Sequence, residues 1–120
     1  MITKEKLKAF GANTEEGITR CAGMEDFYLQ MVEQSLSEAR IPDLRSAIEK
    51  KDYTAAFETA HALKGIFSNL SIDPLLEPVG KLTEILRAAQ KDGITSEKEQ
   101  ECTALLSAAE AKFEEFKKLF

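Results

Sequence analysis

Apolar residues recur every three or four positions through almost the whole chain, and this rhythm restricts the fold more than any other feature. Such spacing places apolar side chains on one stripe of an α-helix, whereas a half-buried strand requires alternation with a period of two. No stretch alternates in that way. The clearest stripe belongs to the C-terminal segment and consists of Cys102, Leu105, Leu106, Ala109, Phe113, Phe116 and Phe120. The pattern predicts an all-α fold.

Capping residues, glycine and proline divide the N-terminal half into four helices. The expected helices are residues 3–10 (ended by Gly11), a short helix capped by Asn13, a helix from about Glu25 to Arg40, and residues 43–51. Glu16 follows Asn13 at the spacing of a capping box. Pro42 disfavours helical geometry in the residue before it, so the third helix is expected to end there. Phe27 belongs to the apolar stripe of that third helix.

Three longer helices are expected in the C-terminal half. Asp52 can cap a helix from Tyr53 to about Leu70, and Asp73 followed by Pro74 is a start signal for the next, which ends at Asp92–Gly93. Pro78 is expected to kink that helix or delay its start. Ser96, with Glu99 three residues later, is expected to begin the last helix. Helices of about 16 to 23 residues with short connections pack as antiparallel neighbours. We therefore expect residues 1–120 to form one domain, an up-and-down antiparallel four-helix bundle with short additional N-terminal helices.

Composition narrows the cellular setting and the partners. The net charge of −5 disfavours nucleic acid and anionic membranes as partners. No apolar segment has the length of a signal core or a membrane span. Cys21 and Cys102 stand alone, which suits buried thiols in a reducing compartment, although a single disulfide between them stays open. We expect a soluble, cytoplasmic monomer.

The predicted helix from Tyr53 to Leu70 carries His61, the only histidine of the chain. At 100° per residue its core-facing arc consists of Tyr53, Ala56, Ala60, Leu63, Phe67 and Leu70. His61 lies on the flank of this arc, together with Lys64, Gly65 and Ser68. The surface beside it is small and uncharged, formed by Ala62, Gly65 and Asn69. This arrangement predicts an exposed imidazole on a smooth helical surface rather than in a pocket.

These residue types suit phosphoryl transfer. A neutral imidazole, with a reference pKa of about 6.5, is nucleophilic at neutral pH without an activating base. Lys64, one helical turn after His61, can reach the charged oxygens of a phosphoryl group. Gly65 costs about 1 kcal/mol relative to alanine inside a helix. Its position suggests that it leaves room for a second molecule to approach the ring, although a close helix–helix contact is the alternative.

The string from His61 to Leu70 resembles the motif of histidine-containing phosphotransfer (HPt) domains, His-x-x-Lys-Gly followed by a small residue and Asn-Leu. Residues 13–20, 25–28 and 81–87 also resemble segments of that family. The resemblance implies a helical bundle in which His61 accepts a phosphoryl group and exchanges it with an aspartate of response-regulator receiver domains. It implies a sensor histidine kinase as a further partner, and Mg²⁺ on the receiver but no cofactor on this chain.

Two departures from the family pattern affect packing rather than chemistry. Ser71 stands where the family usually has a glycine after Asn-Leu, so the geometry of the helix C-terminus is in question. Ile66 and Phe67 are bulkier than the residues common at those positions. We expect altered packing and a narrower set of partners.

Other functions are weaker alternatives. Glu58 and His61 have the Glu-x-x-His spacing of di-iron bundles, but a second such unit is missing unless the protein dimerises. No P-loop, Gly-rich nucleotide string or catalytic triad is present, so kinase activity is not expected. A receiver-binding adaptor without transfer is the remaining alternative. The partner of the second ring nitrogen stays open among Thr83, Lys81 and Arg87.

Overall fold

The computed structural model describes residues 1–120 and contains seven α-helices, which cover 80% of the chain, and no strands. The helices are α1 (Lys4–Phe10), α2 (Thr14–Arg20), α3 (Glu25–Glu38), α4 (Ile41–Glu49), α5 (Tyr53–Asn69), α6 (Asp73–Asp92) and α7 (Ser96–Lys117). The all-α prediction is confirmed. None of the helices is both long and apolar enough to cross a membrane.

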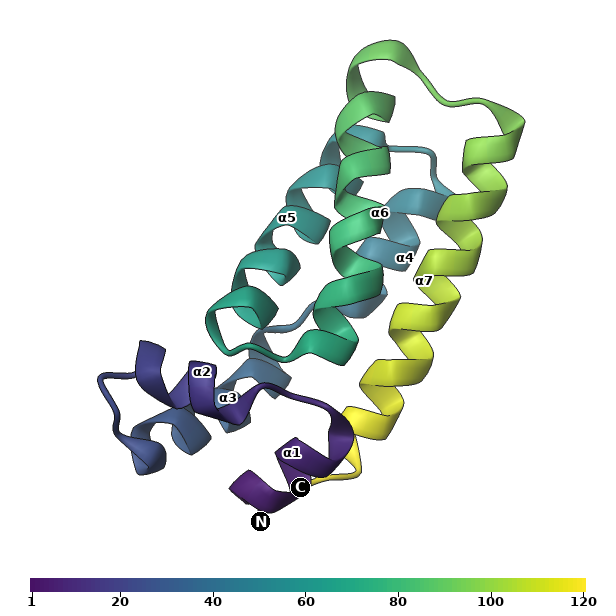
Figure 1. Cartoon of the computed structure of the whole chain (residues 1–120). Coiled ribbons are helices and arrows are strands. Elements are labelled where there is room, and N and C mark those ends of the chain that lie inside the picture. The colour runs from purple at the N-terminus through teal and green to yellow at the C-terminus, as the bar shows by residue number, and fades with distance from the viewer.

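The three longest helices, α5, α6 and α7, lie side by side and alternate in direction (Figure 1). The shorter α4 packs against α5, and α1–α3 lie across the end of the molecule where α5 ends and α6 begins (Figure 1). The molecule measures 43 × 25 × 20 Å along its principal axes. The exact four-helix up-and-down arrangement is not confirmed, because only three helices are long and α4 has 9 residues.

One continuous core connects these helices. Its largest fully buried side chains include Tyr28, Leu44, Leu63, Phe67, Leu75, Leu82, Leu106 and Phe116. The predicted core arc of α5 is buried from Ala56 to Leu70, and Tyr53 at its start is partly buried. Phe27 does not join this core and is 43% exposed. Tyr28, one residue on, takes the inward position, because successive helical positions differ by about 100°.

Prolines account for two differences from the expected helix boundaries. α4 begins at Ile41 and includes Pro42 in its first turn, where the missing N–H of proline costs no helical hydrogen bond. The break before it therefore falls at Ala39 and Arg40. α6 begins at Asp73 and continues through the buried Pro78, so this proline does not delay the helix.

Helix caps follow the local sequence with small shifts. Asp52 caps α5 as predicted, accepting a hydrogen bond from the Ala55 N–H at 3.1 Å. α7 is capped by Thr95, one residue before the predicted Ser96, and its hydroxyl accepts from the Lys98 N–H at 3.1 Å. At α6 the cap position is Ile72, which offers no side-chain acceptor, and Asp73 is the first helical residue instead of the cap.

The turn between α5 and α6 has the hydrogen bonds of a Schellman motif. The Ile72 N–H donates to the Phe67 carbonyl at 2.9 Å, and the Ser71 N–H donates to Ser68 at 3.1 Å. Ser71 therefore adopts a left-handed φ of 55°, the conformation that glycine favours. Its side-chain hydroxyl is buried without a hydrogen-bond partner. The helix end that the sequence left in question thus keeps a regular geometry, with serine in a conformation that favours glycine.

The same turn holds the N-terminal helices in place. The buried Tyr28 hydroxyl donates to the Leu70 carbonyl at 2.9 Å, and burial raises the pKa of Tyr28 to about 12. The Asn13 N–H donates to the Ser71 carbonyl at 2.9 Å. Because that N–H is occupied, the predicted capping box is incomplete: Glu16 accepts from the Asn13 side-chain amide instead, at 3.1 Å.

Two further contacts join distant parts of the chain. Arg45 of α4 donates two hydrogen bonds to the Glu110 carboxylate of α7, at 2.5 and 2.6 Å. The N-terminal amino group donates to the Phe120 carbonyl at 3.0 Å, so the two chain ends meet below the bundle (Figure 1). Cys21 and Cys102 are both buried and free, as predicted for packing thiols, and burial raises the pKa of Cys102 to about 11.

Candidate functional site

His61 lies midway along α5 and is exposed, next to the fully buried Ala60. Its ring stacks on Phe57, one turn earlier on the same helix, with 5.6 Å between ring centroids and 11° between ring planes. Near-parallel rings at this separation are offset, so Phe57 lies beside the imidazole and leaves it open to solvent.

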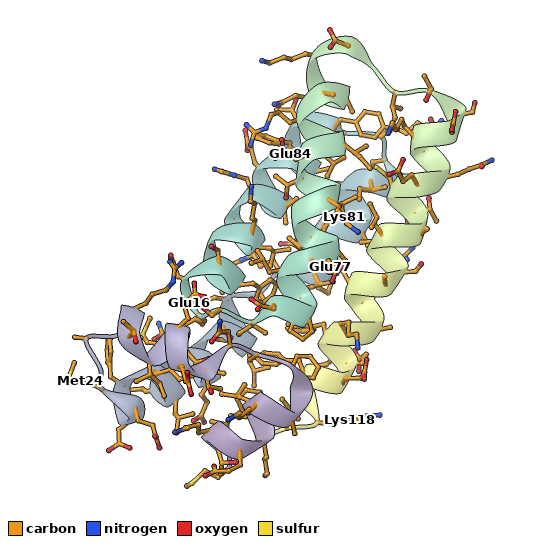
Figure 2. The ribbon with its side chains drawn as sticks, viewed as in Figure 1. Glu16, Met24, Glu77, Lys81, Glu84 and Lys118 are labelled. Carbon is orange, nitrogen blue, oxygen red and sulfur yellow. The ribbon has the colours of Figure 1, made fainter.

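The neighbouring helix α6 adds two charged side chains to this region. The guanidinium carbon of Arg87 lies 4.9 Å from the centroid of the Phe57 ring, on which it makes a cation–π contact. Glu84 accepts hydrogen bonds from Arg87 at 3.3 and 3.4 Å. The Lys64 ammonium of α5 lies 3.8 Å from the same Glu84 carboxylate. Glu84 projects from α6 on the side that faces α5 (Figure 2).

The surface that continues from His61 along α5 is small and open. Ala62, Gly65 and Asn69 are exposed, and Ser68 is partly buried. A Cβ atom added at Gly65 would have no neighbouring heavy atom within 4 Å. Gly65 therefore makes no close helix–helix contact, and a packing reason for this glycine is absent.

The three residues considered as partners of the second ring nitrogen are engaged elsewhere. The Thr83 hydroxyl is buried and donates to the Val79 carbonyl at 2.7 Å. Lys81 pairs with Glu77 at 3.5 Å, and both line the groove between α6 and α7, away from α5 (Figure 2). Arg87 is the one that lies on the His61 side, where it contacts Phe57, the ring that stacks with the imidazole.

Phe57 and Glu84 were not singled out by sequence reasoning. Phe57 precedes His61 by four residues, a spacing that places two side chains on the same helix face, and could have been noticed. Glu84 depends on the register between α5 and α6, which no local pattern encodes. As for the metal alternative, Glu58 is exposed, and no group of three or more His, Cys, Asp or Glu side chains converges on a potential metal site.

A shallow groove runs beside the exposed flank of α5. It has a volume of about 240 Å³ and is lined by Glu38, Arg40, Glu58, Thr59, Ala62, Leu63 and Ile66. These residues come from the end of α3, the α3–α4 connection and α5. The groove adjoins the small-residue surface at Ala62, and His61 is not among its lining residues.

The fold is a helical bundle that exposes its single histidine on α5, and it can be compared with known families. The family model of the Hpt domain matches residues 20–112, so the chain belongs to the Hpt domain family. Hpt domains are phosphocarrier modules in two-component signalling and interact with kinases and response regulators. Comparisons with curated proteins and with solved structures returned no significant match.

Proposed function

We propose that this chain is a histidine phosphotransfer protein in which His61 accepts a phosphoryl group from the aspartyl phosphate of a receiver domain and returns it to another receiver. One observation carries the proposal: the only histidine is exposed midway along α5, with Lys64 one turn away and open space at Gly65. Membership of the Hpt domain family supports the same assignment.

The chemistry requires little beyond position and charge. A lone pair on an imidazole nitrogen of His61 attacks phosphorus, and the N–P bond forms as the bond between phosphorus and the aspartate oxygen breaks. The electron pair of the broken bond stays on the aspartate carboxylate. The other ring nitrogen keeps its proton, and the ring carries a positive charge until that proton is released to solvent. Transfer to the next receiver reverses these steps.

The surroundings of His61 can assist this transfer in two ways. Lys64 is 39% exposed, and its flexible stem allows the ammonium to turn from Glu84 toward phosphoryl oxygens near His61. The exposed Ala62, Gly65 and Asn69, with Ser68 beside them, leave a receiver free to bring its aspartate into line with the imidazole. Mg²⁺ would be held by the receiver, and no cofactor is proposed for this chain.

The proposed partners are response-regulator receiver domains and a sensor histidine kinase, with this chain as a cytoplasmic carrier and not a kinase. The net charge of −5 and the two free, buried thiols support that setting. An adaptor that binds receivers without transfer is the competing function, and the intact His61, Lys64 and Gly65 favour transfer.

The test is incubation with a panel of phosphorylated receiver domains in the presence of Mg²⁺, followed by detection of acid-labile, base-stable phosphate on this chain. We expect labelling of the natural chain and none of a folded His61→Gln variant. Glu58→Gln, an exposed change one turn away, should label normally. Undiminished labelling of His61→Gln would exclude His61 as the acceptor, and receiver binding without any labelling would establish the adaptor.

The Lys64→Ala substitution tests whether Lys64 contacts the phosphoryl group or is only a solvated surface lysine. Because the exposed ion pair with Glu84 contributes little to stability, the variant should unfold at nearly the same temperature. Phosphoryl exchange should be slower at matched receiver binding. Unchanged exchange kinetics would show that Lys64 has no part in transfer.

A further inference from the structure

The charged groups around His61 form one connected set that spans two helices. Lys64 of α5 and Arg87 of α6 both contact Glu84, at 3.8 Å and at 3.3 and 3.4 Å. Lys98 of α7 lines the surface groove beside Glu84 but pairs with Glu101 at 3.1 Å. Glu84 is therefore the one carboxylate that contacts both Lys64, one turn after His61, and Arg87, which lies against Phe57.

We infer that Glu84 masks the charges of Lys64 and Arg87 while His61 is unphosphorylated and releases both cations to the phosphoryl group. The inference rests on the proposed function, in which His61 is the acceptor. It assigns a role to a side chain that does not itself contact the imidazole in the structure: Glu84 neutralises the local positive charge until a more strongly charged anion arrives.

The geometry of the contacts suits such an exchange. Glu84 is 58% exposed and Lys64 39% exposed, and the distances are long for charge-assisted hydrogen bonds. Exposed pairs of this kind contribute little to stability, so they break at little cost. A phosphoryl group carries about two negative charges and three acceptor oxygens, and attracts both cations more strongly than one carboxylate does.

The position of Arg87 explains how a cation on α6 can reach His61. Its guanidinium lies 4.9 Å from the centre of the Phe57 ring, and that ring is stacked on the imidazole. Phe57 thus contacts both the guanidinium and the imidazole. Lys64 follows His61 by three positions on α5, whereas Phe57 precedes it by four, and Glu84 contacts both Lys64 and Arg87.

The experiment labels the intact chain with phosphoramidate, a small anionic phosphoryl donor that needs no receiver. Removing the Glu84 charge should expose both cations and raise the rate of His61 labelling. We expect Glu84→Gln to label about two- to fivefold faster than the natural chain at about 0.01 M salt, with the difference lost near 1 M. Glu84→Asp retains the charge and should restore a rate close to that of the natural chain.

The matched control is Glu77→Gln, which removes the same charge from an exposed position of α6 that pairs only with Lys81. It should label at the natural rate, because Glu77 faces α7. A rate for Glu84→Gln that equals or falls below that of the natural chain would overturn the inference, and so would an equal gain in Glu77→Gln. Failure of every receiver to label His61, with the phosphoramidate result as expected, would overturn the proposed function alone.

Discussion

Ser71 has a backbone conformation that suits glycine better than serine. Its φ of 55° is imposed by the two hydrogen bonds that close α5, and its buried hydroxyl has no partner. A left-handed conformation costs a residue with a side chain roughly 1–2 kcal/mol, and an unpaired buried hydroxyl adds to that cost. The fold tolerates both because the turn also anchors Tyr28 and Asn13.

Ser71→Gly should therefore stabilise the protein by about 1 kcal/mol, after allowance for the greater freedom of glycine in the unfolded chain. Urea unfolding followed by circular dichroism measures this change. The control is Ser35→Gly, since Ser35 is equally buried but lies inside α3 and donates to the Val32 carbonyl, so stability should fall. A loss of stability in Ser71→Gly would show that the serine side chain packs favourably in this turn.

On the scale of single helices, two glycines occupy opposite environments. Gly65 of α5 has open space where a Cβ would lie. At Gly17 of α2 the same atom would overlap the Tyr28 ring and lie 2.9 Å from the Leu70 carbonyl oxygen. Gly17 allows α2 to pack against α3 and the end of α5, whereas Gly65 has no packing role.

Alanine should consequently have opposite effects at the two positions. Gly65→Ala should gain up to about 1 kcal/mol of stability from better helix propensity, and Gly17→Ala should lose about 1–3 kcal/mol from overpacking. Thermal unfolding measures both. Gly65→Gln should keep a midpoint near that of the natural chain yet block transfer from a receiver. Destabilised Gly65 variants whose folded fraction still transfers would make Gly65 a packing residue.

The sequence predicted those features of the helices that depend on short-range spacing. Asp52 acts as the expected cap of α5. Lys64 and Gly65 lie about one turn after His61 on the same face, because helical positions three and four apart are neighbours. Phe27 was misplaced because two adjacent aromatic residues compete for one inward position. Arg87 was only one of three candidates on α6 and Glu84 was not singled out, because their positions relative to α5 depend on the register between the two helices and on the rotamers of long side chains.

For the molecule as a whole, the Arg45–Glu110 pair joins α4 to α7 across 65 residues of sequence. Hydrogen bonding from the guanidinium lowers the pKa of Glu110 below its usual range. The folded protein thus binds a proton at Glu110 less readily than the unfolded chain. The stabilisation is complete above the ordinary glutamate pKa of about 4.3 and is lost as pH falls through the lower folded-state value.

Glu110→Gln should be less stable than the natural chain at neutral pH, and the difference should shrink below about pH 4.3. Melting temperatures between about pH 3 and 7 measure this convergence. Glu49→Gln is the control, because Glu49 makes only one longer contact with Arg45, at 3.4 Å, and should track the natural chain. A difference for Glu110→Gln that stays constant with pH would show that the ion pair does not couple to protonation.

The meeting of the two chain ends has a mechanical consequence. Because the N-terminal amino group contacts the Phe120 carbonyl, a pull applied to both ends acts at a single point below the bundle. We expect such a load to separate α1 from the C-terminal end of α7 before any long helices slide past each other. We also expect tension to reach α5, in the middle of the chain, only after those terminal contacts have opened, so that the helix that bears His61 is among the last parts of the molecule to be strained.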